Sequence, residues 1–161
     1  MGSVVSPAIL ATATARRCLL PLLLAAGLLA ASFSLLPPSA QAITRHTGER
    51  VVHIAASKKG TPYRYGAAGP RAFDCSGYTA WVFAHVGRQL PHNAEAQKHA
   101  VRHITSAHRQ VGDLVFFASH GHVYHVAIYA GRDRVWHAPR TGERVHRERL
   151  WTRQVTYGRV H

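Results

Sequence analysis

The sequence predicts an α+β domain in which helices come first and a mainly antiparallel sheet of five or six strands follows. Two observations support this prediction. In residues 43–161, apolar residues first recur at helical spacing and later form short runs separated by turn residues. The sequence contains no internal repeat or low-complexity tract, so we expect a single domain.

Residues 1–42 have the composition of an export signal. Arg16-Arg17 form a basic start, residues 19–36 are almost entirely apolar, and Ala40-Gln41-Ala42 resembles an A-x-A cleavage site. We therefore expect cleavage after Ala42 and no stable membrane insertion of the processed protein. The alternative is an uncleaved anchor, because the apolar core approaches the length of a membrane span.

Cleavage would remove Cys18 and leave Cys75 as the only cysteine in residues 43–161. A disulfide within one processed chain would then be impossible. A lone thiol in an exported protein either bridges to another molecule or is a reactive group.

The chain is strongly basic, with 20 Lys and Arg residues against 7 Asp and Glu. Without the two leader arginines its formal charge falls from +13 to +11. This charge favours polyanions, but the basic residues are scattered singly and no nucleic-acid-binding motif is present. Anionic wall polymer or a membrane surface fits an exported protein better than nucleic acid. An arginine-rich soluble surface is the alternative.

The elements expected before the sheet are a loose arm (43–49), a helix (50–59) ended by Gly60, an irregular Gly/Pro-rich loop (61–70), and a short helix from the N-cap Asn93 to Val101. Strands are expected at 113–118, 125–130 and 134–138, with weaker candidates at 144–148 and 155–160. The strands at 125–130 and 134–138 should pair as a hairpin.

The segment Phe73–Tyr78 leads from the loop into an apolar helix, with Cys75 in its first turn. The expected inward face of this helix consists of Tyr78, Trp81, Val82, His85 and Val86. Gly87 follows as the expected C-cap glycine. A thiol at a helix start feels unpaired backbone N–H groups and the positive end of the helix dipole, which favour the thiolate. Cys75 is therefore a candidate nucleophile, and a small buried hydrophobe is the alternative.

A thiol nucleophile needs a base, and the base needs an orienting partner. His125 opens one strand of the expected hairpin and His137 lies near the end of the other, so the two can meet at the same end of the sheet. With 13 histidines in the chain, this hairpin relation is what singles out the pair.

The order of four motifs resembles the NlpC-type cell-wall cysteine peptidases, which have a papain-like α+β fold; the motifs are Asp74–Gly77, Gly112–Phe117, His125–Gly131 and His137–Pro139. The resemblance covers residues 47–161. It implies Cys75 as nucleophile, His125 as general base and acid, His137 as the orienting residue, and a backbone N–H at Cys75 for the oxyanion. It also implies that Tyr63, Asp74 and Ser76 line the acyl-side pocket.

The function implied by the resemblance is that of a secreted peptidoglycan endopeptidase, extracellular or in the cell wall, acting on stem peptides. The scissile amide would join γ-D-glutamyl to a diamino acid, with no cofactor or metal, and the protein is expected to be a monomer. Three positions depart from the family pattern: Tyr65-Gly66-Ala67 replaces Trp-Gly-Gly, Val111 replaces Pro, and Ala127 replaces Gly. These departures concern substrate specificity and not the reaction.

Three other functions compete with this interpretation. His120, His122 and His125 could bind a metal if a loop presents them, since one strand cannot direct all three to one face. The basic surface could belong to a wall-binding domain without catalysis. The same Cys–His–His site could also serve an amidase or an acyltransferase.

Overall fold

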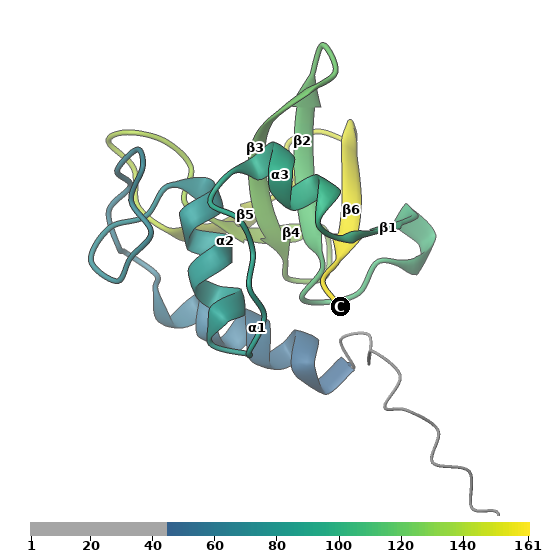
Figure 1. Cartoon of the computed structure of the whole chain (residues 1–161), viewed down its shortest axis with the longest axis horizontal. Coiled ribbons are helices and arrows are strands. Elements are labelled where there is room, and N and C mark those ends of the chain that lie inside the picture. Colours follow the sequence, from purple (N-terminus) through teal and green to yellow (C-terminus); the bar gives the residue numbers. More distant parts are fainter. Residues whose placement is uncertain (1–44) are drawn as a thin grey trace, which may run out of the picture. The chain divides into compact units, whose positions relative to one another are not determined.

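The computed structural model describes residues 45–161, in which three helices pack on one face of a six-stranded antiparallel sheet (Figure 1). The elements are α1 (Arg45–Ser57), α2 (Cys75–Ala84), α3 (Ala94–His99), β1 (Arg102–Ile104), the 3-10 helix η1 (Ser106–His108), β2 (Leu114–Ser119), β3 (His122–Tyr129), β4 (Arg134–His137), β5 (His146–Arg149) and β6 (Val155–Arg159). The strand order is β1-β6-β2-β3-β4-β5. The predicted α+β class is thus confirmed, and the expected cleavage site lies outside the described residues.

Both faces of the central strands are buried, which explains why the β2 segment is continuously apolar. Leu114 and Phe116 pack on the helices, whereas Val115 and Phe117 join a second cluster on the opposite face. Alternate residues of a strand point to opposite faces, so we call the side away from the helices the outer face. Among residues 45–161, no helix is long and apolar enough to span a membrane.

The expected loose arm at 43–49 is wrong from Arg45 onward, because α1 begins there. Gly48 is buried in close contact with the Val111 carbonyl, where a larger side chain would not fit. This contact with the segment before β2 stabilises a first turn that the local sequence does not predict. The strand β1 is also unpredicted: its three residues are mostly exposed, and it forms by pairing with β6.

The helix α2 begins at Cys75 as predicted, but its buried surface is wider than one stripe. Tyr78 and Val82 are fully buried as expected, whereas His85 is exposed. Thr79 and Phe83 are buried instead, because α2 packs against α1, α3 and the sheet at once. The other short helix, α3, has the predicted N-cap at Asn93 and ends at His99.

Candidate active site

The start of α2 is held by Asp74, whose extended backbone makes it the N-cap. One carboxylate oxygen accepts the Gly77 N–H at 2.7 Å and the Ser76 hydroxyl at 3.1 Å. The other accepts the Gly66 N–H at 2.9 Å and His92 Nε2–H at 2.8 Å. A cap of this kind satisfies helix N–H groups that otherwise lack partners. Asp74 therefore fixes the loop, the helix start and the His92 segment around the thiol.

The residues predicted to line the acyl-side pocket all lie close to Cys75. Asp74 and Ser76 are buried, and their side chains are turned toward each other. Burial raises the pKa of Tyr63, and the charges of the nearby Cys75 and Asp74 raise it further. Its N–H donates to the Glu143 carbonyl at 2.9 Å, which anchors the loop beside the thiol. The pocket-lining role of these three residues stays a prediction.

Cys75 lies at the open edge of β3. The next strand, β4, pairs with β3 only at Ile128 and Tyr129, so β3 is free of β4 at His125 and Val126. The Val126 N–H faces the Cys75 sulfur, together with the N–H groups of Ser76 and of Cys75 itself. The half-buried thiol is thus held between the start of α2 and the strand that carries His125.

The expected net lowering of the thiol pKa is wrong. Burial raises the pKa of Cys75, and the charge of Asp74 raises it further. The three backbone N–H groups lower it, as the helix-start argument requires, but they do not outweigh burial. Cys75 therefore rests as a thiol at neutral pH.

The two predicted histidines do meet, on the outer face. His125 Nε2 lies 2.8 Å from His137 Nδ1, with the rings 5.1 Å apart and nearly perpendicular. Both side chains are buried. Burial lowers the pKa of His125 to about 4. Burial is also the main cause that lowers the pKa of His137 to about 3, and the charges of His125 and His146 contribute to this lowering. Both imidazoles are therefore neutral near pH 7, and His125 Nδ1 remains as the ring nitrogen that can take a proton from the thiol.

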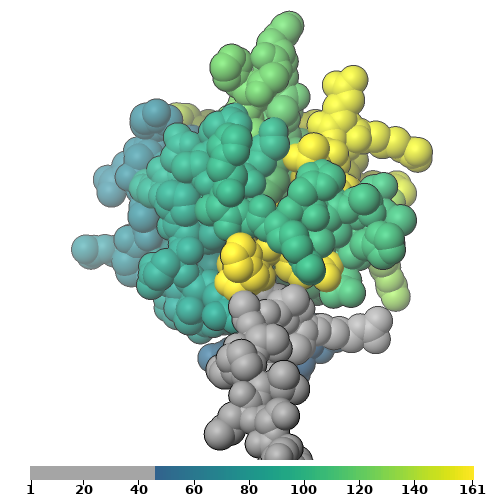
Figure 2. All heavy atoms as spheres, turned by 45° about the vertical axis from the view of Figure 1, so that its right-hand side comes forward, coloured from purple at the N-terminus to yellow at the C-terminus, as the bar shows by residue number. Residues whose placement is uncertain are grey.

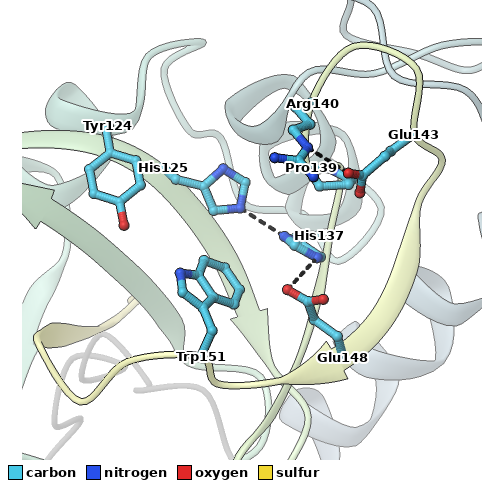
Figure 3. A pocket seen from close by; sticks show the side chains of 8 residues that line it. All are labelled: Tyr124, His125, His137, Pro139, Arg140, Glu143, Glu148 and Trp151. Atoms are coloured by element: carbon cyan, nitrogen blue, oxygen red, sulfur yellow. Dashed lines mark hydrogen bonds and ion pairs between the residues drawn. The ribbon is translucent and has the colours of Figure 1, made fainter.

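Glu148 extends this chain of side chains and was missed by the sequence reasoning. Its Oε1 lies 3.4 Å from His137 Nε2, and the row His125–His137–Glu148 is visible in Figure 3. The β4–β5 register places Glu148 opposite Val135, on the same face as His137. The segment 144–148 was only a weak strand candidate, so its pairing with β4 could not be predicted.

A hollow of about 420 Å³ adjoins the histidine pair on the outer face (Figure 3). Trp151 forms one wall: its ring stacks on Phe117 at 4.1 Å and lies 5.5 Å from the His137 ring. The lining residues are Tyr124, His125, His137, Pro139, Arg140, Glu143, Glu148 and Trp151. Cys75 does not line this hollow, which adjoins the thiol region through His125.

The alternative metal trio on the β2–β3 hairpin is not assembled. His120 and His122 are exposed near the tip of the hairpin, which projects from the body in Figures 1 and 2. His125 is buried and bonded to His137. Within residues 45–161, the histidines and carboxylates close enough to share a metal ion are His137, His146 and Glu148.

Comparison with known proteins gives a consistent result: residues 60–160 match the NlpC/P60 family. A probable endopeptidase of Corynebacterium glutamicum is 42% identical over 102 residues, which are 63% of this chain and 48% of that protein. The probable endopeptidase p60 of Listeria monocytogenes is 38% identical over 112 residues, or 66% of this chain and 23% of that protein. The chain thus spans less than half the length of these two relatives.

Solved structures show the same similarity. The NlpC/p60 domain of the peptidoglycan hydrolase SagA has a TM-score of 0.64 and 36% identity, over 71% of this chain and 97% of that chain. The peptidoglycan hydrolase RipB of Mycobacterium tuberculosis has a TM-score of 0.64 and 27% identity, over 73% of this chain and 66% of that chain.

Proposed function

Because the chain belongs to the NlpC/P60 family, as its motifs predicted, we propose that it is an exported cysteine peptidase that cleaves peptidoglycan stem peptides. Its papain-like α+β fold, also predicted, is that of the solved domains of this family. The observation that carries the proposal is the 2.8 Å contact between His125 and His137 at the open edge of β3. The Val126 N–H at the same edge faces the Cys75 sulfur.

The reaction begins with attack of the Cys75 sulfur on the amide carbonyl carbon while His125 Nδ1 takes the thiol proton. The oxyanion is met by the backbone N–H of Cys75 at the start of α2. His125 then gives its proton to the leaving amine, the C–N bond breaks, and an acyl-enzyme remains. A water molecule gives a proton to His125 and attacks the thioester. The carboxylic acid product leaves, and His125 returns its proton to the Cys75 sulfur.

His137 orients the base in this scheme. His125 donates its Nε2–H to His137 Nδ1, which leaves His125 Nδ1 unprotonated and ready for the thiol. This assignment puts the proton of neutral His137 on Nε2, toward the Glu148 carboxylate at 3.4 Å. Glu148 does not accept a hydrogen bond from this nitrogen, but its negative charge favours the proton of His137 on Nε2, so we assign it as a positioning residue that acts through His137.

The scissile bond we propose joins γ-D-glutamyl to a diamino acid. The hollow beside His125 carries both signs of charge, with Arg140 paired to Glu143 at 2.6 Å and Glu148 on another side. A diamino acid released as the leaving group also carries both signs, so the lining suits it. An amidase or an acyltransferase would use the same Cys–His–His chemistry on another bond or acceptor.

Export and wall retention complete the proposal. The composition of residues 1–42 supports export, and the net positive charge supports adsorption to anionic wall polymer. Such adsorption should weaken as salt screens exposed charges, and wall binding that is unchanged by salt would contradict this part.

The experiment that tests the function is a digest of defined muropeptides followed by mass spectrometry. We expect a product ending in γ-D-glutamate and a matching product beginning with the diamino acid. Cys75→Ala should give neither product, and a chelator should not abolish cleavage. A different cleaved amide, or a transfer product without hydrolysis, would replace the endopeptidase assignment. Cleavage by Cys75→Ala would reject the thiol mechanism.

A further inference from the structure

We propose that His137, His146 and Glu148 form a Zn²⁺ site, and that an ion bound there inhibits the enzyme by reversing the tautomers of the catalytic histidines. The inhibitory half rests on the proposed peptidase function, whereas the binding half does not.

The sheet register brings the three side chains together. His137 and His146 are directly opposite each other on β4 and β5, and Glu148 follows His146 by two residues, on the same face. Their ligand atoms all lie within 4.8 Å of one another. The two histidine rings are 5.0 Å apart at their centroids. Antiparallel pairing thus gathers two imidazoles and one carboxylate on the outer face, beside the hollow.

The two distances between Glu148 and the histidine nitrogens are close to those between ligands of a tetrahedral ion. Ligands about 2.0–2.1 Å from Zn²⁺ are separated by about 3.3 Å along a tetrahedral edge. Glu148 Oε1 lies 3.4 Å from His137 Nε2, and Glu148 Oε2 lies 3.4 Å from His146 Nε2. Glu148 thus lies at about an edge distance from each histidine, through a different carboxylate oxygen in each case. One of these oxygens would bind the ion, and the adjoining hollow can supply a water as the fourth ligand.

The buried nitrogen of His137 independently indicates a ligand. His137 is 2% exposed, and its Nε2 makes no hydrogen bond among the described residues. Glu148 is within ion-pair distance of this nitrogen but not aligned to accept from it. A buried nitrogen without a hydrogen bond is costly, and coordination would satisfy it.

The second nitrogen of each histidine is already oriented. His146 Nδ1–H donates to the Arg144 carbonyl at 2.8 Å, which is the shorter contact of this ring, and Nε2, 3.4 Å from Glu148 Oε2, is the nitrogen that would bind the ion in place of this longer contact. His137 Nδ1 is held by His125 at 2.8 Å. Metal-binding histidines are commonly fixed in this way through the ring nitrogen that does not bind. Two imidazoles and a carboxylate are ligands that suit Zn²⁺.

Inhibition follows from where the protons must go. Without metal, His137 carries its proton on Nε2 and accepts from His125 at Nδ1. An ion on Nε2 requires neutral His137 to carry the proton on Nδ1, which then donates to His125 Nε2. The proton of His125 moves to Nδ1, the nitrogen that should take the thiol proton. No proton is lost, but the base loses its acceptor while Cys75 stays untouched.

Binding is tested first, in a chain without thiols. The Cys18→Ser/Cys75→Ala variant is titrated with Zn²⁺ by calorimetry near neutral pH, and Co²⁺ spectra report the ligand type. We expect one ion per chain, and affinity lowered at least about tenfold by His146→Ala or Glu148→Gln. The matched control is His99→Ala, which removes an exposed histidine 3.3 Å from Glu95 and should leave affinity unchanged. Unchanged affinity in His146→Ala, or loss in His120→Ala, would overturn the site.

Inhibition is tested separately on stem-peptide cleavage, each variant being compared with its own rate without metal. Zn²⁺ should inhibit the unmodified chain and His99→Ala equally, and inhibition of His146→Ala should require at least about tenfold more Zn²⁺. Equal inhibition of His146→Ala would mean that the ion acts on the thiol, which overturns the inhibitory half. A chain without peptidase activity would reject the proposed function and leave the binding result standing.

Discussion

The two sides of His125 are built differently. On the helix side, Asp74 satisfies four donors within and around the first turn of α2, and the cysteine that follows it is fixed by local sequence. On the outer face, His137, His146 and Glu148 come together through strand register, and His137 Nε2 has no hydrogen bond within residues 45–161. The nucleophile side is a closed network, whereas the orienting side is open to solvent and to ligands through the hollow. This difference separates what holds the site together from what tunes its chemistry.

The largest effects should come from the residues that meet at the boundary between the two sides. Cys75→Ala removes the atom that forms the acyl-enzyme, and His125→Ala removes the proton carrier of both half-reactions. Both should reduce stem-peptide cleavage to background, and Cys75→Ser should be nearly as inactive because a hydroxyl is far less acidic. The rate of stem-peptide cleavage is measured for each variant, and circular dichroism checks that each variant is folded. A His125→Ala variant that retains most of the rate would contradict the role of His125.

The next effect belongs to the orienting side. His137→Ala removes the acceptor that holds the His125 ring, and we expect a loss of about 10²–10⁴-fold in kcat/KM. His137→Asn or His137→Gln can still accept the hydrogen bond and should retain a measurable part of the rate. Steady-state kinetics of the three variants test the ranking. Equal losses in all three would show that hydrogen bonding to His125 is not what His137 supplies.

Asp74 and Glu148 are the carboxylates of the two sides, and removing each should affect stability and rate differently. Asp74→Ala removes a helix cap and leaves buried donors unpaired, so the free energy of unfolding should fall by about 3 kcal/mol. Glu148→Gln leaves strand pairing intact and should change the free energy of unfolding by less than about 0.5 kcal/mol. It should lower the rate about tenfold, because the charge that favours the His137 proton on Nε2 is lost. Urea unfolding of both variants measures the free energy of unfolding, and steady-state kinetics measure the cleavage rate. A Glu148→Gln variant as unstable as Asp74→Ala would remove the distinction.

The pH profile should be unusually broad. Neutral His125 is needed as base, and because burial lowers its pKa to about 4, activity should persist as pH falls through 6.5 and be lost only near 4. The alkaline limb follows loss of the Cys75 proton, whose pKa burial raises above 9.0. The measurement is kcat/KM against pH. An acid limb near 6.5 would show that His125 is more hydrated than the structure indicates.

The parts of the site that depend on local sequence could be predicted, and the parts that depend on strand pairing could not. The cap, the helix start and the β3–β4 hairpin depend on residues close in sequence, so Asp74, Cys75, His125 and His137 could be found. Glu148 and Trp151 could not, because their places depend on the pairing of β5 with β4 and on the stack against Phe117. The thiol pKa was predicted in the wrong direction because a local helix-start argument contains no term for burial by the sheet. Likewise, α1 begins early because Gly48 meets a segment about sixty residues away in the chain.

Whether the Cys75 thiol carries the reaction is tested by titration with iodoacetamide. Residual cleavage of a defined stem peptide is plotted against the fraction of Cys75 alkylated, as measured by peptide mapping, which separates it from Cys18. If Cys75 is the nucleophile, the plot is a straight line that reaches zero activity when every Cys75 is labelled, whatever the labelling of Cys18. Cleavage that persists in protein with fully alkylated Cys75 would contradict it.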